Sequence, residues 1–190
     1  MSNAREQILQ TTCDLMEKQG YHGTGLNEIV KESGAPKGSL YHYFPEGKEQ
    51  ITSEAVLQSG RATAERIQNG LKGNSNAAKA IHDFILNIAD HVESSGFAAG
   101  SPLTAVAMET ATQSERINSA CREAYTLLET AFKEKLLESG FTKRQAEELG
   151  TFITAAIEGG IILSRTAHNV DPLLVVAKQL RTVIASAMKA

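Results

Sequence analysis

The stretch 20–48 constrains this chain more than any other, because short apolar-patterned segments alternate in it with turn-forming residues. Its first segment has helical spacing of apolar residues, and we expect Thr24 to cap that helix at its N-terminus. Gly34 is expected to end the first helix, and Pro36 to occupy the first position of the next. Two short helices joined by a turn of three to four residues form a helix-turn-helix. The apolar residues of the first helix are Leu26, Ile29 and Val30.

The second short helix, over 36–44, has an inward and an outward face. Leu40 and Phe44 are four residues apart and point inward together. The second helix of a helix-turn-helix can lie in the major groove of DNA, so its outward side chains are candidates for base contacts. The outward residues of this helix are Lys37, Gly38, Tyr41 and His42.

Lys37 and Gly38 are unfavourable as mere scaffold. The helix dipole disfavours a positive charge near a helix N-terminus, and glycine inside a helix costs about 1 kcal/mol relative to alanine. Both residues suit a helix that lies against a phosphate backbone, since Lys37 can pair with it and Gly38 permits close approach. The alternative is a solvated lysine and a glycine required for packing. The outward Tyr41 and His42 favour the DNA interpretation.

These residues resemble the signature of TetR-family transcriptional repressors, and the resemblance covers about the first fifty residues. It implies a homodimer that reads a palindromic operator with residues 36–43 and holds phosphates with Thr24, Tyr43 and Lys48. In three places the chain departs from the family pattern. Pro36 stands at the usual position of a serine N-cap, Met16 stands where the family often has phenylalanine, and the loop before Lys48 is one residue longer. The expected DNA-binding residues are Thr24, Pro36, Lys37, Gly38, Ser39, Tyr41, His42, Tyr43 and Lys48.

The charge balance argues against a generally basic nucleic-acid coat. The whole chain has a formal net charge of −3. Residues 1–50 are themselves acidic, so DNA binding would depend on a few placed donors and on helix N-termini, with weak non-specific affinity. This segment contains five cationic and seven acidic residues. The cationic residues are Arg5, Lys18, Lys31, Lys37 and Lys48, and the acidic residues are Glu6, Asp14, Glu17, Glu28, Glu32, Glu46 and Glu49.

Composition and periodicity predict an all-α fold. Of the 190 residues 42% are hydrophobic and 5% aromatic, and no sustained alternation of apolar and polar residues indicates a strand. We expect a three-helix DNA-binding domain over 1–47, followed over 48–190 by a six-helix bundle for effector binding and dimerisation. The expected helices are 4–19 (ended by Gly20), the two short helices, 48–71, 77–94, 101–112 (opened by Ser101-Pro102), 114–139, 142–167 (with a Thr142/Gln145 capping box), and a last helix capped by Asp171-Pro172.

The helix 142–167 indicates a second copy of the chain. Its middle is apolar nearly all round, so both sides are expected to be buried. Gly159 and Gly160 would together cost about 2 kcal/mol inside a helix, which implies close backbone contact. The alternative is a helix at the centre of one large bundle. The expected dimer residues, on this helix and the last, are Phe152, Ala156, Gly159, Gly160, Leu163, Leu180 and Ile184.

A ligand-responsive regulator also needs an effector pocket, formed by apolar residues with a few polar ones. The segment 100–111 and the Ala35-Pro36 pair resemble the multidrug- and flavonoid-responsive (LmrA/QdoR-like) branch, which implies a planar aromatic or lipophilic effector. Helix 48–71 is the expected transmitter to the DNA-binding domain. For each candidate, ordinary core or surface is the alternative. The candidates are Phe84, Ile88, His91, Phe97, Met108, Glu109, Tyr125, Phe132 and Phe152.

No motif indicates an enzyme, a cofactor or a metal site, since the five histidines have no metal-ligand spacing. The absence of a signal peptide and of a long apolar run predicts a cytoplasmic protein without a membrane span. Of the two cysteines, Cys121 is expected to be buried and the role of Cys13 stays open. Two other classes remain, an all-α enzyme and a helical ligand-binding or interaction module, and neither needs the outward face that carries Tyr41.

Overall fold

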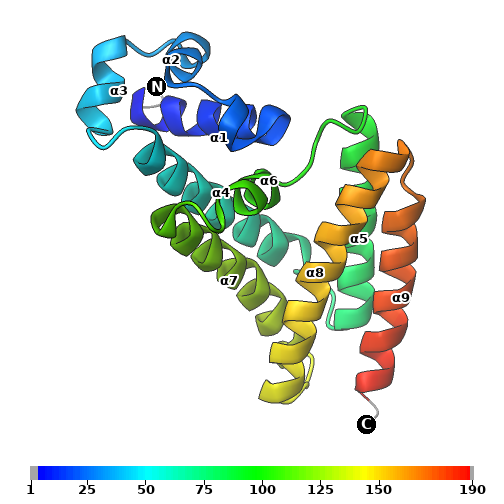
Figure 1. The fold of residues 1–190 in the computed structure, drawn as a ribbon. Coiled ribbons are helices and arrows are strands. Elements are labelled where there is room, and N and C mark those ends of the chain that lie inside the picture. The colour runs from blue at the N-terminus through cyan, green and yellow to red at the C-terminus, as the bar shows by residue number, and fades with distance from the viewer. Residues whose placement is uncertain (1–3, 189–190) are drawn as a thin grey trace. The chain divides into compact units, whose positions relative to one another are not determined.

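The structure is a computed structural model that describes residues 4–188, and these residues form nine α-helices and no strand (Figure 1). The predicted all-α class is thus confirmed. In chain order the helices are α1 (Ala4–Gly23), α2 (Leu26–Ser33), α3 (Lys37–Tyr43), α4 (Lys48–Gly70), α5 (Ala77–Ser94), α6 (Pro102–Thr110), α7 (Glu115–Glu138), α8 (Lys143–Ala167) and α9 (Asp171–Ala187).

The chain divides into two compact units. The first unites α1, α2, α3 and α6 with the N-terminal parts of α4 and α7, over residues up to 61 and over 101–124. The second comprises 62–100 and the residues from 125 onward, which include α5, α8 and α9. Helices α4 and α7 therefore contribute to both units.

A buried apolar cluster holds the helix-turn-helix together. Leu40 and Phe44, the inward pair of α3 and its C-cap, have no exposed surface. They pack with residues of α1, α2 and the first turns of α4. A helix of seven residues is too short to be stable alone, so this burial fixes the position of α3. The other buried members of the cluster are Ile8, Leu9, Cys13, Ile29, Ala35, Ile51 and Ala55.

In the second unit, α5, α8 and α9 lie side by side (Figure 1). Gly160 allows α8 and α9 to approach closely, because a Cβ atom there would lie 3.0 Å from Leu173 Cδ2 and 3.2 Å from Val176 Cγ2. A Cβ atom on the neighbouring Gly159 would meet nothing within 4 Å. The two glycines that the sequence suggested as one contact therefore serve different surfaces.

Most of the predicted local signals are confirmed. Helix α5 has the predicted bounds, with Asn76 as its N-cap. Ser101 caps α6, with Pro102 in its first turn. Thr142 and Gln145 form the predicted capping box of α8. Gly34 ends α2 in the left-handed conformation, with φ 64°.

Other cap predictions are wrong. The N-cap of α2 is Gly25, because the Thr24 side chain is buried and its hydroxyl donates to the carbonyl oxygen of Gly20 over 2.8 Å. Pro36 is the N-cap of α3, with extended ψ, instead of its first helical residue.

The helical conformation of α1 breaks at Gly20, with φ 74°, where the prediction ended this helix, and a short second helical stretch continues to Gly23. One further helix start differs from the prediction. Asp171 begins α9 without capping it, since Val170 is the N-cap and provides no side-chain hydrogen bond. Among the described residues, no helix is long and apolar enough to cross a membrane.

Candidate nucleic-acid interface

The outward face of α3 is exposed as predicted. Pro36, Lys37, Gly38 and His42 are exposed, and half of the Tyr41 surface is accessible. Ser39 at the start of the helix is half-buried. Neither α2 nor α3 has a side-chain cap at its N-terminus, so N–H groups of their first turns can bind an external acceptor. The face combines a cation, an imidazole and a phenol over a rigid apolar base, which suits contact with base edges and phosphates.

The three residues expected to hold phosphates differ in accessibility. Thr24 is fully buried, its hydroxyl donates to the carbonyl oxygen of Gly20 and its backbone N–H to that of Tyr21, so neither group is exposed to a phosphate in this structure. Tyr43 is half-buried and lies edge-on to His42, with ring centroids 5.1 Å apart. Lys48 is half-buried, and its Nζ lies 4.2 Å from the centroid of the Tyr21 ring. Burial lowers the pKa of Lys48, and the Glu109 carboxylate partly opposes that shift.

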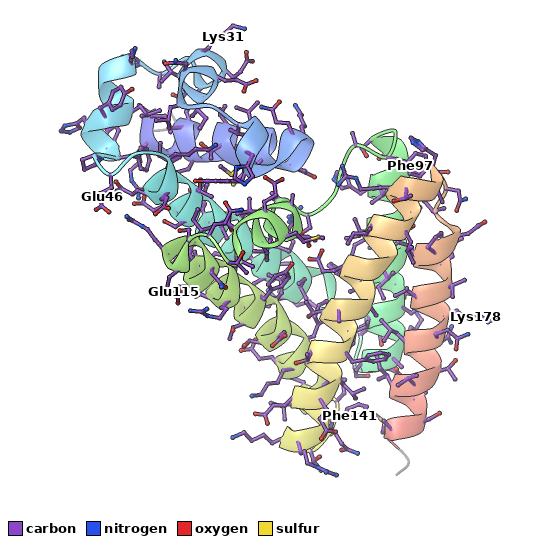
Figure 2. The ribbon with its side chains drawn as sticks, viewed as in Figure 1. Lys31, Glu46, Phe97, Glu115, Phe141 and Lys178 are labelled. Carbon is purple, nitrogen blue, oxygen red and sulfur yellow. The ribbon has the colours of Figure 1, made fainter. Side chains whose placement is uncertain are left out.

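The longer loop between α3 and α4 is held by a residue that the sequence did not single out. Arg116, in the first turn of α7, forms an ion pair with Glu46 of this loop (Glu46 is labelled in Figure 2). Its Nε also donates to Ser53 Oγ of α4 over 3.2 Å. The Arg116 guanidinium thus joins the loop that follows α3 to α4. Because Glu46 and Arg116 are separated by 70 residues in the chain, no local pattern could reveal the contact.

The structure brings two effector candidates together. The rings of Phe84 on α5 and Phe132 on α7 meet edge to face, with centroids 6.1 Å apart. Phe132 is 2% exposed, and Phe84 packs over the backbone of Gly70, where a Cβ atom would lie 2.6 Å from its ring. Ile88 and Tyr125 are half-buried.

The other effector candidates have different surroundings. Phe97 lies beside the C-terminal end of α8, its ring 5.5 Å from that of His168 (Figure 2). His91 is exposed on α5, and 48% of the surface of Phe152 is exposed on α8. Met108 and Glu109 belong to the first unit, where Met108 is 78% exposed and the Glu109 carboxylate contacts α1.

The dimer candidates divide between an outer surface and the interior. Phe152 and Leu163 are 48% and 59% exposed, which disfavours the alternative of a helix at the centre of one large bundle. Gly160 packs against α9 of its own chain, and Leu180 and Ile184 are buried inside it. Ala156 is half-buried. Further exposed apolar residues on α8 and α9 are Ile162, Leu174, Val175 and Val183.

Both thiols are buried and poorly ionised. Cys13 Sγ donates to the carbonyl oxygen of Ala55 over 3.1 Å. Burial, together with the charges of Asp14 and Glu17, raises the pKa of Cys13 to about 12. Burial raises the pKa of Cys121 to about 11. Since the thiolate is the reactive form, both side chains are structural in character at neutral pH.

A helix-turn-helix with an exposed second helix, joined to a helical bundle, defines the class of helix-turn-helix transcriptional regulators. Residues 8–55 match the family described as "Bacterial regulatory proteins, tetR family". Residues 77–179 match the family described as "Transcriptional regulator LmrA/YxaF-like, C-terminal domain". The chain therefore belongs to the TetR family of DNA-binding transcriptional regulators, with a C-terminal domain of the LmrA/YxaF-like type.

Relatives agree with this assignment over nearly the full length. The chain is 43% identical to the uncharacterized HTH-type transcriptional regulator YxaF of Bacillus subtilis (strain 168), covering 96% of this chain and 95% of that protein. It is 41% identical to the HTH-type transcriptional regulator LmrA of the same organism, covering 90% and 92%. The crystal structure of reduced E. coli NemR shares the fold, with a TM-score of 0.80 at 22% identity, covering 95% of this chain and 97% of that chain.

Gly38 offers a test of close approach between α3 and DNA. A Cβ atom at Gly38 would meet nothing within 4 Å in the protein. We expect Gly38→Ala to raise the free energy of unfolding by up to about 1 kcal/mol, through helix propensity, and yet to weaken DNA binding. Thermal unfolding and the dissociation constant for a bound duplex measure the two effects. Unchanged DNA affinity would show that the backbone of α3 does not approach the duplex.

Proposed function

We propose that the chain is a repressor that binds a palindromic operator as a homodimer and releases it when a small apolar effector binds. The exposed face of α3 supports this proposal. It places Lys37, Tyr41 and His42 on the outer side of a helix whose inner side is buried in the apolar cluster. These side chains would read base edges in the major groove, while Lys48 and N–H groups of α2 hold phosphates.

The second copy would cover the exposed apolar face of α8 and α9. Phe152, Ile162 and Leu163 on α8, with Val175 on α9, are between 45% and 59% exposed. An apolar face of this kind is typical of a protein–protein interface, and a two-fold axis through it pairs the same helices of both copies. Gly159 lies on α8 with open space in front of it, which permits close approach of the partner. Gly160, Leu180 and Ile184 support this face from inside.

The effector would bind among aromatic residues of the C-terminal domain. Phe84 and Tyr125 are partly exposed, and the buried Phe132 packs edge to face against Phe84; aromatic surfaces of this kind favour a planar aromatic or lipophilic compound. Release requires that the effector bind two arrangements of the dimer with different affinity, a coupling typically worth about 1–3 kcal/mol. Movement of α4 would change the spacing of the two recognition helices. By reciprocity, operator DNA weakens effector binding by the same factor.

Selection of bound duplexes from random DNA by the purified protein tests the proposed function. We expect a palindrome whose half-sites are separated by about one helical turn, ~34 Å, or a multiple of it, because two copies of α3 must meet one face of DNA. Enrichment of a sequence without two-fold symmetry would contradict the homodimer. No enrichment at all would favour the alternative of a ligand-binding or interaction module without a DNA function.

Replacement of Lys48 tests its assignment to phosphate. We expect Lys48→Ala to weaken binding to the selected duplex and to unrelated duplexes alike, and to reduce the slope of log affinity against log salt by about one unit. Titrations at several salt concentrations measure both quantities. A change in sequence preference would instead assign Lys48 to base recognition.

Replacement of Leu163 tests the dimer surface. Leu163→Glu would bury a carboxylate in an apolar contact, and we expect the dimer dissociation constant to rise by more than about tenfold. Sedimentation velocity measures the change. Leu137→Glu is the matched control, since Leu137 is a 40% exposed leucine on α7, outside the proposed surface. An equal response of the two variants would exclude Leu163 from the interface.

A further inference from the structure

Helix α6 packs against α1, and one carboxylate of α6 also hydrogen-bonds to the α1 backbone. Glu109 Oε2 accepts a hydrogen bond from the backbone N–H of His22, over 2.8 Å. The approach requires a glycine at position 20, because a Cβ atom there would lie 1.9 Å from Glu109 Oε1. Gly20 also has the left-handed φ of 74° that interrupts α1. Both carboxylate oxygens therefore lie against the backbone near the C-terminal end of α1.

The same carboxylate acts on Lys48. The Lys48 ammonium lies over the ring of Tyr21, which is the residue between Gly20 and His22. Burial lowers the pKa of Lys48, and the charge of Glu109 opposes this by stabilising the ammonium. Tyr21, Lys48 and Glu109 thus form one polar cluster, which we call the α6 contact. It joins α6 to the start of α4 and to the kink of α1.

We propose that Glu109 competes with an operator phosphate for the Lys48 ammonium, and that the α6 contact thereby links the position of α6 to DNA affinity. The proposal rests on the proposed function, in which Lys48 holds a phosphate. The Glu109 charge already partly compensates the charge of the Lys48 ammonium, so a phosphate that pairs with Lys48 gains less attraction than it would beside an uncompensated lysine. The fixed Glu109 therefore opposes DNA binding, and withdrawal of α6 from α1 reduces that opposition.

The hydrogen bond from His22 to Glu109 makes the competition for Lys48 depend on the position of α6. A free glutamate side chain would turn towards solvent as a phosphate arrives, at little cost. The Glu109 carboxylate instead accepts a charge-assisted hydrogen bond from the backbone N–H of His22, next to Tyr21, whose ring lies under the Lys48 ammonium. Glu109 is thus a positioning residue, and its charge moves only when α6 moves. Since the loop 95–101 connects α6 to α5, this gives the C-terminal domain a route to the DNA-binding helices besides α4.

The test is a double-mutant cycle of Glu109→Gln and Lys48→Ala. Glutamine keeps an oxygen that can accept the His22 N–H but removes the charge. We expect Glu109→Gln to tighten binding of the selected duplex and of an unrelated duplex by about threefold to tenfold at low salt, and less at high salt. In the Lys48→Ala background the same change should leave affinity unaltered, because no ammonium remains to compete for.

Glu123→Gln is the charge-matched control. Glu123 lies in the same unit, on α7, and its partner is Arg61 at 3.7 Å. We expect this variant to bind both duplexes like the unmodified protein. An equal gain from Glu123→Gln, or a gain from Glu109→Gln that persists without Lys48, would reduce the effect to net charge and overturn the proposal. Weaker binding by Glu109→Gln would also overturn it, since Glu109 would then only anchor α1.

A second measurement guards against loss of structure in the variant. NMR titration of labelled lysine in the absence of DNA should show a lower pKa for Lys48 in Glu109→Gln, because the stabilising carboxylate is gone. An unchanged pKa in a folded variant would overturn the proposed competition. If the unmodified protein enriches no duplex, the proposed DNA-binding function itself is contradicted. If it enriches a duplex but Glu109→Gln leaves the affinity for that duplex unchanged, only the present inference is contradicted.

Discussion

Burial of Leu40 and Phe44 is the interaction on which the structure depends. Helix α3 has seven residues, and such a helix does not form in water without tertiary packing. The two side chains have no exposed surface and pack against α1, α2 and α4. Because the apolar side of α3 is fixed in this way, its polar side keeps a constant orientation at little entropic cost on binding. The exposed polar face of α3, which we propose to read DNA, is therefore positioned by the core beneath it.

Local features of this fold were predictable because their physics is local. The Ser101-Pro102 cap and the Thr142/Gln145 capping box involve residues within a few positions of each other, and both were predicted from the chain. The cap predicted at Thr24 failed because its hydroxyl reached back to Gly20. Serine and threonine hydroxyls choose between several nearby backbone partners, and the sequence alone does not decide among them.

Contacts between distant residues were not predictable in the same way. Glu109 was a reasonable effector candidate from its place beside Met108, but its carboxylate contacts His22, which lies 87 residues earlier. Arg116 had no sequence signal, and only the folded chain joins it to Glu46. Gly159 and Gly160 were read as one close contact, whereas only Gly160 meets another helix of its own chain. Contacts between residues far apart in the chain depend on which helices pack together. The pattern of a single sequence does not show directly which helices do so.

The two adjacent glycines separate internal fit from external recognition by one residue. Gly160 is constrained by Leu173, so a larger side chain there disturbs the chain's own packing. Gly159 has open space in front of it. In the proposed dimer, a larger side chain at this position would affect only the contact with the partner. After gene duplication, two copies of such a chain can diverge at position 159 and at its exposed neighbours without loss of the fold. Each copy can then acquire a private partner surface, and two related regulators in one cell can avoid mixed dimers.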